Sequence, residues 1–360
     1  RAQELCRRSG ETPEMFGVLF ALWSFDHASG QLRESLVIAQ QLLEMAERVK
    51  SEFAIASARN AMGATQLWMG DFAESKKNLE AAAEFFDRDV ARYLPMMQAP
   101  VIPSRSNLMW AAHIAGYPEQ ARRLVGEAEA LAAQLRRPFS HGFVHMYAIV
   151  LDHFQRDYRN IRARSETLIE LATEYGFPYW LAAGKMCLAR TIAGEAYFLG
   201  DQAALEAGLK MVKESVENLA ASNADLIYSF SFVILAEVHL MMKRTDECLE
   251  VLAKAQQRAD DMDHRLLEAE IHRLRGEIML LNPQGAEEAE RSFRHAIEIA
   301  TRQRANSWRL RAANSLARLL SKTARRADAR AALAPAYAQF TEGFNTYDLL
   351  EAKSLLGELS

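Results

Sequence analysis

The sequence predicts an all-α protein, a right-handed superhelical solenoid of about eight antiparallel helix pairs. A small set of apolar and small side chains returns about every forty residues. Apolar residues recur with the i, i+3, i+4, i+7 periodicity of helices throughout the chain, and alternating stretches of useful length are absent. With 360 residues, the chain exceeds what a single core usually organises, which favours an array whose units contact only their neighbours.

Each unit pairs two small residues that lie twelve positions apart. The second small residue is followed by a bulky residue four positions on and by alanine seven positions on. This spacing describes two antiparallel helices that approach closely at their small residues, and it matches the tetratricopeptide (TPR) pattern. The clearest copies contain Gly63 with Ser75, Ala236 with Cys248, and Ala317 with Ala329.

The second small residue serves as the anchor of each unit, and neighbouring anchors lie 40 to 46 residues apart. The standard TPR repeat is roughly 34 residues long, so we expect helices about one turn longer than usual and a broad concave face. An earlier and weaker unit has its second helix over residues 31–49. The unit around Ser165 also fits less well, because Asp152 and His153 stand where leucine and a small residue are expected. The anchors are Ser75, Ala121, Ser165, Leu205, Cys248, Ala289 and Ala329.

Turn signals separate the predicted helices and offer Asp or Thr as N-terminal caps. Residues 93–104 contain three prolines and are predicted to form an irregular connection between the N-terminal repeats, residues 1–92, and residues 105–360, which hold the remaining repeats and a C-terminal helix. Turns within units are expected at 70–71, 116–118, 200–201, 244–246 and 282–285, and turns between units at 176–178, 222–223 and 261–263.

Composition limits the possible partners. A net charge of -4 and a pI near 6.2 give no electrostatic footprint of a nucleic-acid or membrane binder. The three cysteines are isolated, so neither a disulfide framework nor a zinc knuckle is expected, and a reducing, cytoplasmic setting is the simplest interpretation. The apolar runs 15–25 and 226–236 are too short to span a bilayer. Because the chain begins with Arg1, we expect it to be a segment of a larger protein.

The last quarter of the chain carries a more specific resemblance, in "EAEIHRLRGEIMLLNPQGAEEAERSFRHAIEIATRQRANSWRLRAANSLARLL" and "LAPAYAQFTEGFNTYDLLEAKSLLGEL". It resembles the C-terminal TPR-like region of large bacterial signalling proteins that join a class III adenylate/guanylate cyclase to an AAA/STAND-type ATPase module. The resemblance implies a place within such a parent. The sequence has neither a GxxxxGK[ST] loop nor a cyclase sheet pattern, so we expect no catalysis from this segment. Similar tails follow ATPase modules in some transcriptional activators, and both kinds of parent remain open.

The repeat register predicts which side chains line the concave groove. An inner wall that mixes arginine, asparagine, glutamate and aromatic residues suits a protein or peptide segment with polar groups and a few apolar anchors. The predicted partner-binding residues are Asn60, Trp110, His113, Arg190, Tyr197, Glu237, Arg273, Glu277, Arg311, Asn314 and Arg318.

Other clusters have simpler interpretations. His141 and His145 lie one helical turn apart but lack the glutamate of an HExxH motif, so ordinary packing is favoured over a metal site. The acidic runs 260–263 and 287–290 suit solvated helix ends. Arginines gather over residues 302–330 without interleaved aromatic residues for base stacking, so nucleic-acid binding is not expected. Tryptophans near helix ends should pack between repeats: Trp23, Trp68, Trp180 and Trp308.

These observations together predict a non-catalytic scaffold for protein interaction or sensing, with no cofactor and no metal. Its partner is expected to be a protein or peptide segment, which includes other domains of the same polypeptide. We expect the scaffold to regulate an attached ATPase and cyclase. Two alternatives stay open: the sensor tail of an ATPase-type transcriptional regulator, and a purely architectural or dimerisation arm.

Overall fold

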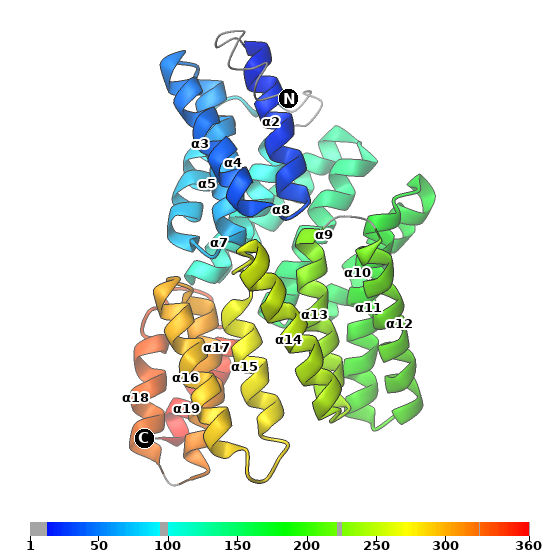
Figure 1. Ribbon diagram of the computed structural model, residues 1–360, viewed down its shortest axis with the longest axis vertical. Coiled ribbons are helices and arrows are strands. Elements are labelled where there is room, and N and C mark those ends of the chain that lie inside the picture. Colours follow the sequence, from blue (N-terminus) through cyan, green and yellow to red (C-terminus); the bar gives the residue numbers. More distant parts are fainter. Residues whose placement is uncertain (1–12, 94–99, 222–224, 324, 360) are drawn as a thin grey trace.

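The computed structural model describes residues 13–93, 100–221, 225–323 and 325–359, and every regular element within these ranges is a helix. Sixteen helices form eight antiparallel pairs, which confirms the predicted all-α solenoid (Figure 1). The pairs are α2 (Pro13–Ala28) with α3 (Leu32–Arg48), α4 (Glu52–Trp68) with α5 (Phe72–Asp87), α7 (Val101–Ala115) with α8 (Pro118–Leu135), α9 (Pro138–Gln155) with α10 (Tyr158–Tyr175), α11 (Pro178–Leu199) with α12 (Gln202–Ala220), α13 (Asp225–Met241) with α14 (Thr245–Met262), α15 (Glu268–Met279) with α16 (Ala286–Arg302), and α17 (Asn306–Ser321) with α18 (Arg326–Tyr337). The short α6 (Val90–Tyr93) and the C-terminal α19 (Tyr347–Glu358) stand outside these pairs.

Small residues bring the two helices of a pair together, as the twelve-residue spacing predicts. All seven anchor residues are buried in the second helix of their pairs. The Ser75 hydroxyl donates to the carbonyl oxygen of Gly63 at 2.7 Å, and the Cys248 thiol lies 3.4 Å from the carbonyl oxygen of Ala236. In each contact the donor of a small side chain finds a backbone acceptor on the facing helix, which only close approach allows.

The predicted turns lie where the helices end. Gly70 and Gly200 adopt left-handed backbone angles, with φ of 78° and 70°, which residues with a Cβ rarely adopt. The next residue in each turn, Asp71 or Asp201, accepts a hydrogen bond from the backbone N–H three positions on and so caps the following helix. The predicted turn at 222–223 lies outside the described residues.

The predicted irregular connection is shorter than expected. Tyr93 ends α6, residues 94–99 lie outside the described residues, and α7 already begins at Val101. The expectation of irregular structure over 101–104 is therefore wrong. Pro103 lies in the first turn of α7, where a missing backbone N–H breaks no intrahelical hydrogen bond, so proline is tolerated there.

The unit around Ser165 is a regular pair despite its unusual residues. Asp152 and His153 occupy the last turn of α9, where Asp152 pairs with Arg164 at 2.9 Å and His153 lies 3.4 Å from Glu237. Buried polar groups are tolerated where they find partners, which is why these two residues do not disturb the helix. The four tryptophans expected to pack between repeats are all buried.

The array curves tightly enough for late helices to contact early ones. In Figure 1 the first helices stand above the last ones on one side of the molecule, and α9 to α14 occupy the other side. The start of α17 lies against the end of α7, where Asn306 and Ser307 donate to the carbonyl oxygens of Ala115 and His113 at 2.9 and 2.5 Å. In addition, the backbone N–H of Arg265 donates to the Trp68 carbonyl at 2.8 Å. The solenoid thus closes on itself through contacts that the predicted broad concave face did not include.

Substituting Gly276 should show how strictly close packing is required within a pair. A Cβ at this position of α15 would lie 2.5 Å from a ring carbon of Phe293, so Gly276→Ala is expected to lower the free energy of unfolding by about 1–3 kcal/mol. Gly126→Ala in α8 is the matched control, because its Cβ would meet nothing within 4 Å and alanine favours helices by about 0.5–1 kcal/mol. Urea unfolding measures both, and equal effects of the two substitutions would contradict the packing argument.

Candidate functional site

Most of the residues predicted to line the groove meet one another on the inner wall of the array. Arg273 of α15 contacts two carboxylates of its own helix, Glu270 at 2.7 Å and Glu277 at 3.0 Å. Arg318 of α17 then lies 2.8 Å from Glu277. Because burial would otherwise raise its pKa, the lowered pKa of Glu277 reflects the charges of Arg273 and Arg318.

A second part of this network joins α9, the start of α10, α11 and α13. Arg190 lies 2.6 Å from Glu237 and donates to the hydroxyl of Tyr158 at 3.3 Å. Burial alone would raise the pKa of Glu237, but the neighbouring His153 and Arg190, with their hydrogen bonds, hold it well below its usual value. Glu237 is therefore ionised and fixed between two helices.

The third part involves residues that the register did not predict. Arg311 donates to Asp348 of α19 at 2.9 Å and also to the carbonyl oxygen of Phe154. Arg156, just after α9, lies 3.3 Å from Asp348 as well. Burial opposes ionisation of Asp348, yet Arg156 and Arg311 lower its pKa. Glu351 of α19 completes this part by pairing with Arg318 at 2.6 Å.

The first and third parts share Arg318 and Glu270, and the second part adjoins the third at the end of α9, through His153 and the neighbouring Phe154 carbonyl. We call the three parts together the inner-wall network, in which arginines and carboxylates are equal in number. Its cations are Arg156, Arg190, Arg273, Arg311 and Arg318, and its anions are Glu237, Glu270, Glu277, Asp348 and Glu351. Removing one member of a buried pair leaves an uncompensated charge, which typically costs about 3–5 kcal/mol. The network consequently holds α9, α11, α13, α15, α17 and α19 in one arrangement.

The remaining predicted groove residues divide into buried and exposed ones. Trp110 stacks on Tyr147 with ring centroids 4.3 Å apart, and neither ring nitrogen of the buried His113 has a hydrogen-bond partner in the described part of the chain. Asn60 and Asn314 are also buried. Tyr197 differs, because it is 47% exposed beside Phe198 and Leu199, which are 85% and 83% exposed. The assignment of the eleven residues to partner binding stays a prediction, since seven of them are buried in this conformation: Asn60, Trp110, His113, Arg190, Arg273, Arg311 and Asn314.

A reciprocal contact closes the array at the corner between α7 and α8. The Glu342 carboxylate, in the segment between α18 and α19, accepts from the backbone N–H groups of Glu119 and Gln120 at 2.9 Å each. The Glu119 carboxylate in turn accepts from the backbone N–H of Gly343 at 2.9 Å. An N-terminal helix turn has free N–H groups and favours negative charge, so Glu342 caps α8 from more than two hundred residues away.

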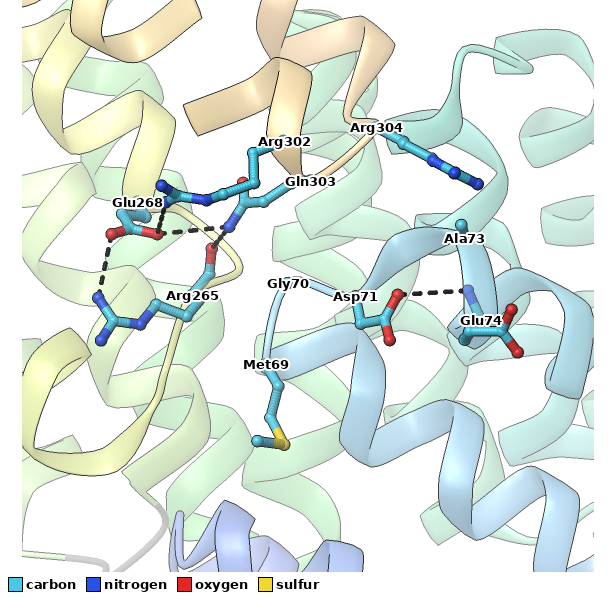
Figure 2. A pocket seen from close by; sticks show the side chains of 10 residues that line it. All are labelled: Met69, Gly70, Asp71, Ala73, Glu74, Arg265, Glu268, Arg302, Gln303 and Arg304. Atoms are coloured by element: carbon cyan, nitrogen blue, oxygen red, sulfur yellow. Dashed lines mark hydrogen bonds and ion pairs between the residues drawn. The ribbon is translucent and has the colours of Figure 1, made fainter. Parts of the chain in front are cut away.

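An open pocket lies where three corners of the fold meet (Figure 2). It has a volume of about 700 Å³ and is lined by the turn between α4 and α5, by the start of α15, and by the turn between α16 and α17. Figure 2 shows Arg265 and Glu268 on one side and Asp71 and Glu74 on the other. From the third corner, Arg302 points toward Glu268 and Arg304 points the opposite way, toward the side of Ala73 and Glu74. We call this feature the corner pocket. The repeat register gives no signal for it, because its three walls come from repeats far apart in the sequence.

The other clusters considered from the sequence are paired or solvated. Within the described residues, no group of three or more His, Cys, Asp or Glu side chains is arranged to hold a metal ion. The acidic runs are partly neutralised, for instance Asp260 by Arg265 at 2.8 Å and Glu290 by Arg294 at 2.7 Å. Among the helices described, none is long and apolar enough to cross a membrane.

Comparison with known proteins gives a likeness of fold. No family model matches the chain, and neither does any curated protein. Among solved structures, a Rap protein complexed with Competence and Sporulation Factor is similar with a TM-score of 0.54 and 10% identity, over 96% of this chain and 98% of that one. A STAND protein with a tetratricopeptide repeat sensor from Pyrococcus horikoshii is similar with a TM-score of 0.45 and 13% identity, over 99% of this chain and 53% of that one, a likeness too distant to argue from. The chain therefore has the fold of an all-α helical-repeat solenoid.

Buried histidines make the stability of this solenoid depend on pH. Burial lowers the pKa of His27 to about 4, and burial together with nearby arginines lowers that of His113 and His264 to about 3. Between these values and 6.5, the unfolded chain binds protons that the folded protein does not. Asp152 acts in the opposite direction, since burial raises its pKa to about 7 and its protonated form stabilises the fold at low pH.

The free energy of unfolding should accordingly fall as pH is lowered from 7 to 5. Each of the three histidines contributes stability that is fully present above pH 6.5 and is lost at up to about 1.4 kcal/mol per pH unit below it, while Asp152 offsets part of this loss. His264→Phe keeps an aromatic ring stacked on Trp68 and should flatten the slope. Urea unfolding at both pH values tests this, and an unchanged slope in the variant would refute the role of His264.

Glu342→Ala should loosen the corner between α7 and α8. Loss of the remote cap leaves two N–H groups without their acceptor, so we expect the amide hydrogens of Glu119 and Gln120 to exchange faster and the protein to lose about 0.5–2 kcal/mol of stability. Hydrogen exchange followed by mass spectrometry resolves this turn. Glu298→Ala, which removes an exposed carboxylate elsewhere, is the control and should change neither quantity.

Proposed function

We propose that this solenoid is a scaffold for protein interaction or sensing. One observation carries the proposal: the C-terminal turn of α11 presents Tyr197, Phe198 and Leu199 to solvent. With 22 residues, α11 is longer than its neighbours α9 and α10, which have 18 each. Clustered large apolar side chains with this exposure are typical of protein contact sites, where they supply most of the binding energy. We call this cluster the α11 tip.

The fold of the Rap protein, which was solved in complex with Competence and Sporulation Factor, supports a ligand-binding role for such an array. The fold alone does not specify a ligand. We infer a protein or peptide segment as partner, because the α11 tip is apolar and aromatic, and because partly accessible members of the inner-wall network, such as Arg318 and Glu277, offer polar groups elsewhere on the array.

Sensing would operate through the curvature of the array. A partner that binds one curvature more tightly than another shifts the population toward it, by no more than the difference in binding free energy. In the form we propose, this shift acts on an attached ATPase module and nucleotide cyclase in a cytoplasmic bacterial signalling protein. The buried groove residues would take part where the inner-wall network opens. An ATPase-type transcriptional regulator is the alternative parent.

A second function follows from the same tip. If two copies of the chain bury their α11 tips against each other, the solenoid is a dimerisation arm. Two-fold contacts of this kind use the same patch on both subunits. Light scattering distinguishes the two functions, since an arm is dimeric without any partner, whereas a scaffold is monomeric until it binds one.

Replacing Phe198 and Leu199 with serine should weaken partner capture at least tenfold and leave the fold intact. Both side chains are mostly in solvent, so their loss removes binding surface without opening the core. Phe25→Ser is the control, because Phe25 is 69% exposed on α2, far along the chain. Affinity capture with the full protein and its bound partner measures the effect. Equal capture by the double variant and the unmodified protein would exclude the α11 tip as the contact.

A further inference from the structure

Two seams hold the closed array together, and each of them contains a buried histidine. We call them the α7–α17 seam and the α4–α15 seam. In Figure 1 both lie at mid-height, between the blue and cyan helices above and the yellow to red helices below. At the first seam, Ser307 donates to the carbonyl oxygen of His113 at 2.5 Å. At the second seam, the backbone N–H of Arg265, the residue after His264, donates to the Trp68 carbonyl at 2.8 Å.

The segment before α19 belongs to the α7–α17 seam. At Gly116, in the turn between α7 and α8, a Cβ would lie 3.1 Å from Asn306 and 3.4 Å from Phe340. The start of α17 and the segment that carries Glu342 therefore rest on the same turn. The hydrogen bonds of Glu342 to the first amides of α8 consequently open together with this seam.

Both imidazole rings lie in aromatic surroundings that the two sides of a seam supply together. The His113 ring stacks on Phe154 of α9 with centroids 6.2 Å apart, and it meets Trp308 of α17 edge to face, also at 6.2 Å. The His264 ring, just after α14, stacks on Trp68 of α4 with centroids 4.8 Å apart. Separation of either seam would therefore bring a histidine ring into contact with water.

The ring nitrogens of these histidines are buried without the partners that polar atoms require. Within the described residues, neither nitrogen of His113 has a hydrogen bond, and Nε2 of His264 has none either. A buried polar atom without a partner lowers stability, whereas phenylalanine would fill the same aromatic stack without this penalty. A histidine at such a position makes favourable polar interactions only when water reaches its ring.

The charges that face His113 come from three helices. Burial is the main cause of its low pKa, and the facing groups are Arg311 of α17, Asp348 of α19 and Arg122 of α8. The two arginines disfavour a further positive charge, and Asp348 is already paired with Arg311 at 2.9 Å. The closed seam thus has no free anion to accept a protonated His113.

The surroundings of His264 are equally unfavourable to a cation. Burial is again the main cause of the low pKa, and Arg258 of α14 and His27 of α2 lower it further. The carboxylate of the adjacent Asp263 is already paired with Arg33 of α3. His27 is itself buried with a pKa of about 4, so it too binds a proton more readily once the seam opens.

We propose that His113 and His264 are acid-sensitive latches: on acidification the array opens at the α7–α17 and α4–α15 seams while its helix pairs stay intact. A hydrated imidazole binds a proton near pH 6.5, and the resulting cation cannot return to its place in the closed seam without losing that proton. For each histidine, the open form is favoured by up to about twentyfold more at pH 5 than at pH 7. Opening uncovers the inner-wall network. This inference goes beyond the proposed function and does not depend on the α11 tip.

Hydrogen exchange of the full chain at pH 7 and pH 5, expressed as protection factors, tests the latches. The reporters are the backbone amides that donate across a seam, namely those of Glu119, Gln120, Arg265 and Leu266. Their protection factors should fall about twentyfold or more between the two pH values. Those inside the pair of α11 and α12 should change much less, because that pair stays closed.

His113→Phe and His264→Phe keep an aromatic ring in each stack and remove the group that binds the proton. Each variant should reduce the fall in protection at its own seam about tenfold or more, and should leave protection at pH 7 unchanged or higher. His295→Phe is the matched control, because His295 is half-exposed on α16 outside both seams. It should behave as the unmodified protein does.

Three results of the exchange experiment would overturn the proposal. The reporter amides keep their protection at pH 5, all helices lose protection together, or the folded variants show the same fall as the unmodified protein, which would assign the fall to a carboxylate such as Glu342. If neither variant folds, small-angle scattering of the unmodified protein decides. Its radius of gyration should rise reversibly from pH 7 to pH 5, and an unchanged radius contradicts opening. Partner capture through the α11 tip is measured at pH 7, so its failure is distinguishable from failure of the latches.

Discussion

The closed form of this solenoid depends on the satisfaction of one buried guanidinium group. Arg311 projects from α17 to Asp348 of α19, to the carbonyl oxygen of Phe154 at the end of α9, and toward Glu270 of α15 at 3.7 Å, with its charge over the ring of Trp308. A buried cation needs acceptors on every side, because its desolvation is otherwise uncompensated. Since these acceptors come from three other helices, α9, α15, α17 and α19 must all be in place together.

This arrangement gives the inner wall a structural role that its composition does not reveal. Arginine, glutamate and asparagine on a concave face are equally suited to a bound segment and to one another. In the closed array these side chains form ion pairs with one another, for example Arg190 with Glu237 and Arg273 with Glu270. A partner that enters this wall has to replace existing ion pairs, so its affinity is reduced by the free energy of opening the network. The exposed α11 tip requires no such opening.

The parts of the fold that follow from local spacing could be predicted from the sequence. A glycine twelve positions before a serine, as in Gly63 and Ser75, specifies close approach within a single helix pair, and both helices lie within forty residues. The contacts that close the array on itself do not depend on local spacing. Glu342 accepts from the first turn of α8, and Asn306 donates to the end of α7, each across about two hundred residues of sequence. A single side chain that makes such a contact is not part of any repeating pattern, so the sequence does not reveal it. For the same reason the corner pocket could not be predicted: Gly70 was expected only as part of a turn, and no sequence pattern connected it with Arg265 or Arg304.

The distribution of apolar contacts indicates which contacts between repeats would break first if the curvature of the array changed. Among the described residues the buried apolar side chains form three clusters: one over α2 to α4, a large central one that extends through α15 as far as Trp308 at the start of α17, and one over α16 to α19. The contacts that join the C-terminal helices to α7, α8 and α9 include few apolar side chains, such as Trp308 against Phe154 with ring centroids 4.9 Å apart. The others are hydrogen bonds in which Asn306, Ser307, Arg311 and Glu342 donate to or accept from backbone groups. Each such hydrogen bond contributes only about 0.5–3 kcal/mol, whereas every helix pair buries many apolar side chains at about 1.5–3 kcal/mol each. A change of curvature would therefore open the contacts of α17 and of the segment before α19 with α7, α8 and α9 before it disrupts any helix pair. An interaction that bridges this seam acts directly on that equilibrium, because it is present only while the two sides are together.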